Sequence, residues 1–123
     1  MKQKIIDIKA VPKPRQTRSD KWKQRPCVVA YRTFADELRL KFGKVPEAAN
    51  AIRVTFAIKV PDSWSRKRKA HTFDTAHQQK PDIDNLLKAV MDALLPEDKG
   101  IARIECQKFW SDVDRITISL GEV

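Results

Sequence analysis

The sequence has few cysteines and no long hydrophobic run. Its 123 residues include only two cysteines, Cys27 and Cys106, and these do not form a C-x-x-C pair. Such a pattern is typical of free thiols in a reducing compartment rather than of a disulfide framework. No apolar segment approaches the roughly 18 residues that a membrane span needs, and the basic N-terminus lacks the apolar stretch of a signal peptide. These absences predict a cytoplasmic protein with no membrane contact.

Histidine is also scarce, and repeats are lacking. His71 and His77 are six residues apart, outside the usual zinc pairings, and no cysteine lies nearby in the sequence, so we expect no zinc site. We find no internal repeat and no low-complexity tract. A chain of 123 residues can bury one core but not two, which predicts a single domain over residues 1–123.

Basic charge is abundant and clustered. The formal net charge is +9, and residues 1–26 alone hold nine lysines and arginines. A second basic run covers residues 66–69. Solvated loops or binding to anionic lipid would explain such runs, but two clusters in a small chain favour a nucleic-acid partner. Trp22 and Trp64 lie within or beside these runs, where they could stack on bases, although we expect one of them to anchor a loop.

Hydrophobic periodicity predicts an α+β fold. The pattern predicts a strand over 3–10, a loop over 11–27, a helix over 28–42, a strand over 51–60, a long basic loop over 61–80, a helix over 82–95, a turn over 96–100, and strands over 101–110 and 115–120 joined by a hairpin turn at 111–114. This β-α-β-α-β-β order favours a two-layer arrangement, with two helices packed on one face of a small mixed or antiparallel sheet.

The predicted helix over 82–95 begins with acidic residues. Asp82 suits the N-cap, where its carboxylate can accept a backbone N–H, and Asp84 and Lys88 follow on the side away from the apolar stripe. Two carboxylates and an ammonium at one helix end could hold a metal ion. The same residues are also ordinary features of a helix start, favoured by the helix dipole and by pairing between residues four apart. Spacing alone leaves both interpretations open.

The segment KPDIDNLLKAVMDAL makes the pattern more specific. Together with the basic Ser63–Lys69 run and the N-terminal Pro-Lys-Pro-Arg loop, it closely resembles the RusA family of Holliday junction resolvases, which are small and often prophage-borne endonucleases. The resemblance covers most of the chain. It implies a homodimeric nuclease that depends on Mg²⁺, or on Mn²⁺, uses no organic cofactor, and makes paired symmetric nicks in four-way DNA junctions during recombination and repair. It also implies a bacterial or phage-encoded, nucleoid-associated protein.

The resemblance assigns roles to particular residues. The two motif aspartates correspond to Asp82 and Asp84, and the motif lysine to Lys88. The third carboxylate of the family corresponds to Asp98, with Glu97 as the alternative, because the turn here is shorter than in familiar relatives. Asp82, Asp84 and Asp98 are the expected metal ligands and, with Lys88, the expected catalytic residues. Pro81 stands where relatives often have arginine, so Lys80 takes over the basic role. The candidate DNA contacts are Lys13, Arg15, Arg18, Arg66, Lys67, Arg68, Lys69 and Lys80.

Two other functions remain open from the residues alone. A module that binds branched DNA or RNA without cutting it would need the carboxylates only as helix caps, and a basic scaffold protein would explain the charge but not the clustered acids.

A two-fold symmetric substrate favours a homodimer. The strands over 101–110 and 115–120 are the candidate interface, because Phe109 and Trp110 point to opposite faces and one of them could contact a partner.

Overall fold

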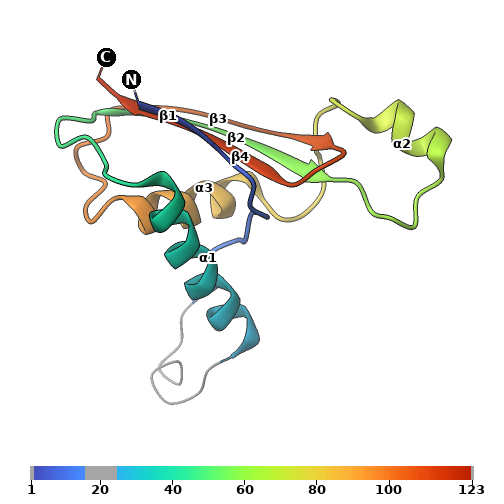
Figure 1. The fold of residues 1–123 in the computed structure, drawn as a ribbon, viewed down its shortest axis with the longest axis horizontal. Coiled ribbons are helices and arrows are strands. Elements are labelled where there is room, and N and C mark those ends of the chain that lie inside the picture. Colours follow the sequence, from blue (N-terminus) through green and yellow to red (C-terminus); the bar gives the residue numbers. More distant parts are fainter. Residues whose placement is uncertain (1, 16–24, 123) are drawn as a thin grey trace.

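The computed structural model describes residues 2–15 and 25–122. Within these ranges it has four strands and three helices: β1 (Lys2–Ile6), α1 (Pro26–Phe42), β2 (Ala51–Lys59), α2 (Arg66–Thr72), α3 (Ile83–Leu94), β3 (Arg103–Ser111) and β4 (Arg115–Gly121). Figure 1 shows the sheet above α1 and α3, with α2 projecting beyond one end of the strands. No helix in these ranges is long and apolar enough to cross a membrane.

Strand β2 lies inside the sheet and organises it. The strand order is β1-β4-β2-β3, in which β2 pairs antiparallel with β4 and parallel with β3. The alternating residues of β2 explain this position, since Ile52, Val54 and Phe56 point toward the helices and are at most 2% exposed. The sheet is therefore mixed, as the sequence predicted.

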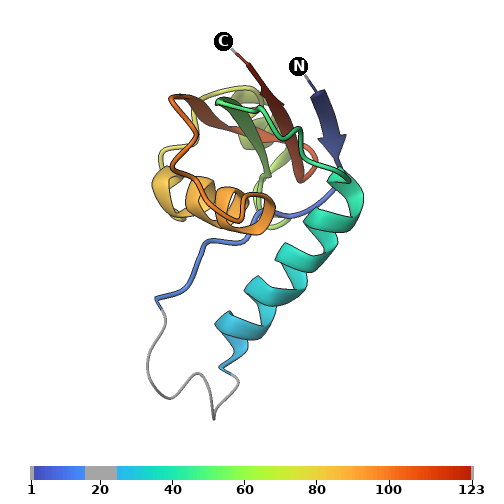
Figure 2. The ribbon, with the colours of Figure 1, turned by 90° about the vertical axis from the view of Figure 1, so that its left-hand side faces the viewer.

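Helices α1 and α3 pack on one face of this sheet, as Figure 2 shows from the side. The buried face of α1 includes Val28, Leu38 and Phe42, and that of α3 includes Leu86 and Val90. The Arg39 Nε of α1 donates to the Ala93 carbonyl oxygen of α3 at 2.7 Å, which satisfies a carbonyl that the end of the helix leaves without an internal partner. The predicted two-layer architecture is confirmed.

The segment over 61–80 is not the uninterrupted loop that the sequence predicted. Residues 66–72 form the short helix α2, whose N-cap Ser65 accepts a hydrogen bond from the Arg68 backbone N–H at 3.1 Å. The helix buries no residue, so it has no apolar stripe from which periodicity could have found it.

The predicted hairpin at 111–114 is wrong. Strands β3 and β4 do not pair, because β2 lies between them. The connection passes around the end of β2, where the Val60 N–H donates to the Ser111 carbonyl oxygen and the Lys59 N–H donates to Asp114 Oδ1, both at 3.0 Å. Because of this connection, the strongly apolar β2 has a paired strand on each side. A β3–β4 hairpin would prevent this arrangement. The predicted first strand is also shorter than expected and ends at Ile6.

The central position of β2 predicts a large loss of stability when its core side chain is truncated. Phe56 is fully buried, so Phe56→Ala should lower the free energy of unfolding by about 3–5 kcal/mol. Ile5, which is 64% exposed on the edge strand β1, provides the matched control. Ile5→Ala should change the stability by no more than about 0.5 kcal/mol. Urea denaturation of both variants measures the difference, and similar losses would contradict the placement of the core.

Candidate functional site

The start of α3 leaves the Asp82 carboxylate unused. Asp82 occupies the N-cap with extended backbone angles (φ −66°, ψ 142°), and its carbonyl oxygen accepts the Leu86 N–H at 3.1 Å. The predicted N-cap position is confirmed. The predicted side-chain hydrogen bond is wrong, since the Asp82 carboxylate makes no capping bond. Its oxygens are therefore available to a ligand.

Asp84 lies in the first turn and is also exposed. Its Oδ1 accepts the backbone N–H of Asn85 at 2.9 Å. Neither Asp82 nor Asp84 forms an ion pair with any residue in the ranges 2–15 and 25–122. The partial positive charge of a helix N-terminus stabilises their negative charge without neutralising it.

Lys108 of β3 binds the segment that precedes α3. Its Nζ donates to the carbonyl oxygens of Gln79 at 2.6 Å and Pro81 at 2.7 Å, which ties the segment before Asp82 to the sheet. Lys108 is not among the functional residues that the sequence predicted. Its position in the strand is the feature that could have identified it. Ile104, Cys106 and Lys108 lie at alternate positions of β3 and share the sheet face that the helices cover, where a lysine needs a polar partner.

A basic cavity adjoins the same helix. It has a volume of about 450 Å³ and is lined by Lys13, Pro14, Arg15, Asn85 and Lys88. The Lys13 N–H donates to the Asn85 carbonyl oxygen at 3.3 Å, so the N-terminal loop runs against α3. The Lys13 ammonium forms an ion pair with Asp92. The structure thus brings Lys13, Arg15 and Lys88 together, and Lys88 forms no ion pair within the part of the chain that the structure describes.

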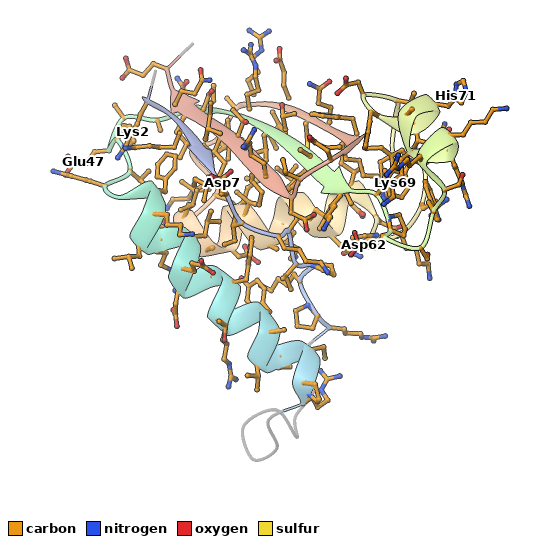
Figure 3. All side chains as sticks on the ribbon, turned by 45° about the vertical axis from the view of Figure 1, so that its right-hand side comes forward. Lys2, Asp7, Glu47, Asp62, Lys69 and His71 are labelled. Atoms are coloured by element: carbon orange, nitrogen blue, oxygen red, sulfur yellow. The ribbon has the colours of Figure 1, made fainter. Side chains whose placement is uncertain are left out.

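The second basic run, residues 66–69, lies on α2, and aromatic rings anchor it. Trp64 lies 5.0 Å from Trp110 between ring centroids, and the Arg68 guanidinium lies 3.5 Å from the centroid of the Trp64 ring. Trp64 is therefore a loop anchor, and Trp110, 8% exposed, is packed within its own chain. Figure 3 shows Lys69 and His71 of α2 at the opposite end of the molecule from Lys2 and Glu47.

The structure describes most of the other basic residues that the sequence predicted to contact DNA. Arg66, Lys67 and Arg68 are exposed, and Lys69 is half-buried. Lys80 is exposed immediately before Pro81 and Asp82. Arg18 and Trp22 lie outside the described residues.

Asp98 is separated from the other two aspartates by the length of α3. This helix has 12 residues and is therefore about 18 Å long. Asp98 lies in the turn beyond its C-terminal end, where the Ile101 N–H donates to the Asp98 carbonyl oxygen at 3.0 Å. Figure 1 shows this turn, in orange, at the opposite end of the sheet from α2. Across residues 2–15 and 25–122, no group of three or more Asp, Glu, His or Cys side chains is placed to hold one metal ion.

An acidic helix start beside two basic surfaces is the arrangement of a protein that acts on nucleic acid, since the basic residues attract phosphate and the carboxylates can hold a cation near it. In the comparison with protein-family models, residues 7–121 match endodeoxyribonuclease RusA. The chain therefore belongs to the RusA endodeoxyribonuclease family, whose members are metal-dependent hydrolases of DNA junctions. No match was found among curated proteins or among solved structures.

The donor atoms present fit part of a divalent-metal site. Asp82 and Asp84 offer hard carboxylate oxygens, which Mg²⁺ prefers, and a protein site for this ion often supplies only one or two carboxylates beside water and substrate phosphate. Both side chains are exposed and outside any ion pair of the described residues. The start of α3 carries these two candidate ligands, and Asp98 lies beyond the other end of the helix.

His77 is buried beneath the anchor of α2. It is 4% exposed, its ring centroid lies 4.1 Å from that of Trp110, and its Nδ1 has no hydrogen-bond partner among the described residues. Burial, and next the nearby charge of Lys108, lower the pKa of His77 below its usual value of 6.5. The imidazole is therefore neutral in the folded protein at neutral pH.

This lowered pKa predicts that mild acid weakens the fold. As the pH falls through 6.5, the unfolded chain takes up a proton at His77 that the folded chain resists, so the free energy of unfolding decreases. His77→Phe keeps an aromatic ring without a titrating group and should make the melting temperature less dependent on pH between about pH 7.5 and 5.5. His71, which is exposed, is the control. A variant His71→Phe that flattens the profile as much as His77→Phe would contradict this assignment.

Proposed function

We propose that this protein resolves four-way DNA junctions by paired symmetric nicks that depend on Mg²⁺ or Mn²⁺, with Asp82 and Asp84 as metal ligands. The observation that carries the proposal is the start of α3, where two exposed carboxylates stay out of ion pairs with the described residues of a chain with net charge +9. A protein that needed these aspartates only as caps would use the Asp82 side chain in a capping bond, which it does not.

The catalytic roles follow from the chemistry of the side chains. The bound metal would polarise the scissile phosphate and lower the pKa of an attacking water. Asp82 and Asp84 bind and orient that ion. Lys88, one turn after Asp84 and free of ion pairs with the described residues, donates to non-bridging phosphate oxygens and stabilises charge that grows in the transition state.

The basic residues position the DNA. Arg15 and Lys88 share the cavity beside α3, and Lys80 precedes the acidic motif, so these residues bind phosphates next to the cut. Lys13 contributes less charge there, because Asp92 already pairs with it. The α2 arm (residues 66–69) binds phosphates farther along the junction, and Arg18 of the N-terminal loop belongs to the same proposed set.

The substrate favours a homodimer. Two cuts at symmetry-related phosphates require two equal sites, and one chain carries one start of α3. The dimer acts in the cytoplasm on nucleoid DNA, in recombination and repair. Of the two strands that the sequence suggested for the interface, β4 is paired on both sides, by β1 and β2, which leaves β3.

The first test removes the proposed metal ligands. Asp82→Asn and Asp84→Asn should each reduce nicking of a four-way junction in Mg²⁺ by at least ~10²-fold, the scale for removing an electrostatic group from a preorganised site. Junction binding should persist or tighten, because each variant has one negative charge fewer near the phosphates. Nicking by the unaltered protein should stop when EDTA is added.

Asp36 of α1 provides the control for these variants, because it is an exposed aspartate whose carboxylate pairs with Arg39 rather than facing the proposed site. Asp36→Asn should nick at the rate of the unaltered protein. Near-normal nicking by both Asp82→Asn and Asp84→Asn would refute the proposed ligands. Tight junction binding without any nicking by the unaltered protein would instead identify a binding module.

The second test concerns the α2 arm. Arg66→Gln combined with Lys67→Gln should weaken binding to junction and duplex alike and reduce the slope of log K against log salt by about 0.9 for each phosphate that the arm no longer neutralises. Arg68 is left intact because it stacks on Trp64. The charge-matched control combines Lys4→Gln with Lys44→Gln, both exposed and outside α2. Equal slopes for the two double variants would show that the arm does not touch DNA.

A further inference from the structure

Residues 78–81 connect the segment over 74–77, which pairs with the end of β3, to the start of α3, and they belong to no helix or strand. They form no backbone–backbone hydrogen bond with any residue in the ranges 2–15 and 25–122, and Pro81 has no N–H to donate. One side chain holds them instead. The Lys108 Nζ donates to the Gln79 carbonyl oxygen at 2.6 Å and to the Pro81 carbonyl oxygen at 2.7 Å. The position of this segment therefore depends on Lys108.

The backbone of Lys108 is itself fixed on both sides. In β3 it lies opposite Phe56 of β2, which is fully buried, and its carbonyl oxygen accepts the His77 N–H at 3.2 Å. Two further hydrogen bonds join the backbone of Trp110 to residues 74 and 75. The ammonium thus reaches the segment over 78–81 from a rigid part of the sheet, which is what an accurate positioning contact requires.

The two contacts suit a protonated amine. An ammonium has three N–H donors and no acceptor, and hydrogen bonds from a charged donor are stronger than those between neutral groups. Lys108 forms no ion pair with a carboxylate in the part of the chain that the structure describes. Its donors point to the backbone, so it can hold the segment without neutralising Asp82.

Asp82 is fixed from both directions by this arrangement. The peptide group between Pro81 and Asp82 is planar, so a hydrogen bond to the Pro81 carbonyl oxygen also orients the Asp82 backbone nitrogen. On the other side, the Asp82 carbonyl oxygen accepts the Leu86 N–H at 3.1 Å. Because the Asp82 side chain makes no capping bond, the direction of its carboxylate depends on these two backbone contacts.

We propose that Lys108 is a positioning residue for Asp82, which acts through the Pro81 carbonyl oxygen and holds the carboxylate where a divalent ion can bind. This inference rests on the function proposed above, because it concerns the same metal ligand. In this role Lys108 touches neither the ion nor the DNA. Replacing a group that orients a metal ligand without contacting the metal typically changes metal affinity or activity by about 10–100-fold.

Two other roles for Lys108 lead to different expectations. An ammonium that acted only by its charge would repel a divalent cation, so its removal would strengthen metal binding. A lysine that only stabilised the fold would lower the melting temperature without changing the metal affinity of the folded protein. Positioning instead predicts weaker metal binding in a protein that is still folded.

The first measurement is binding of Mn²⁺ alone to the full chain, followed by electron paramagnetic resonance. Lys108→Met keeps an unbranched side chain and removes the donors, and it should weaken binding by about 10–100-fold. Lys108→Arg keeps a charge and donors and should bind Mn²⁺ more tightly than Lys108→Met. The matched control is Lys2→Met, because Lys2 also donates to a backbone carbonyl oxygen, that of Lys44, at the opposite end of the molecule from α2 (Figure 3). This control should leave the affinity unchanged.

The second measurement needs no metal. Hydrogen exchange at the Leu86 N–H, followed by NMR, reports whether the first turn of α3 stays closed. The Leu95 N–H, which donates to the Met91 carbonyl oxygen at 2.8 Å, reports the other end of the same helix. Lys108→Met should accelerate exchange at Leu86 relative to Leu95 by at least about 10-fold, the effect of losing a hydrogen bond from a charged donor. The control variant should leave this ratio unchanged.

The outcomes separate this inference from the proposed function. Unchanged or tighter Mn²⁺ binding by Lys108→Met would overturn the inference, as would an equal loss of affinity in Lys2→Met. An unchanged exchange ratio would show that Lys108 does not hold the start of α3. If the unaltered protein binds no Mn²⁺, the proposed metal ligands are wrong, while the exchange ratio still decides whether Lys108 positions Asp82. Weaker Mn²⁺ binding and faster exchange in Lys108→Met, for a protein that never nicks a junction, would support this inference and refute the proposed function alone.

Discussion

The rigid length of α3 constrains everything that one chain can do with its acidic residues. The helix is held against the sheet by an apolar stripe that includes Leu86 and Val90, and its C-terminal end is tied to α1 by Arg39. Its two ends therefore cannot approach each other. Because Asp82 and Asp84 precede or begin the helix and Asp98 follows it, the full length of α3, about 18 Å, lies between the two acidic segments. Asp98 therefore does not join Asp82 and Asp84 at the start of α3.

The parallel pairing of β2 with β3 determines which segments lie at each end of β3. If β3 and β4 formed a hairpin, β3 would either lie between two strands or have a different free edge. In the observed order β3 lies at the end of the sheet. The parallel direction also sets the C-terminal end of β3 beside the start of α3, where Lys108 contacts the Pro81 carbonyl oxygen, and its N-terminal end beside the acidic turn.

Local patterns predicted most of the elements but not how the strands are ordered. The alternation in β2 and the apolar stripe of α3 depend on neighbouring residues, and both were identified from the sequence within a residue or two. The false hairpin arose because a short connection usually joins paired strands, while here the pairing of both edges of β2, by β4 and by β3, decides the strand order. In the site, Asp82, Asp84 and Lys88 could be selected from the motif. Lys108 and the distance to Asp98 could not, because both depend on tertiary packing.

The unpaired state of Asp82 and Asp84 itself requires explanation in a chain with 25 lysines and arginines. Two lysines that contact α3 or the segment before it are engaged elsewhere. Lys13 pairs with Asp92, and Lys108 donates to two backbone carbonyl oxygens rather than to a carboxylate. These contacts keep positive charge close enough to attract phosphate while leaving the carboxylate oxygens unneutralised. The contacts of Lys13 and Lys108 thus use these two ammonium groups without pairing either of them with Asp82 or Asp84.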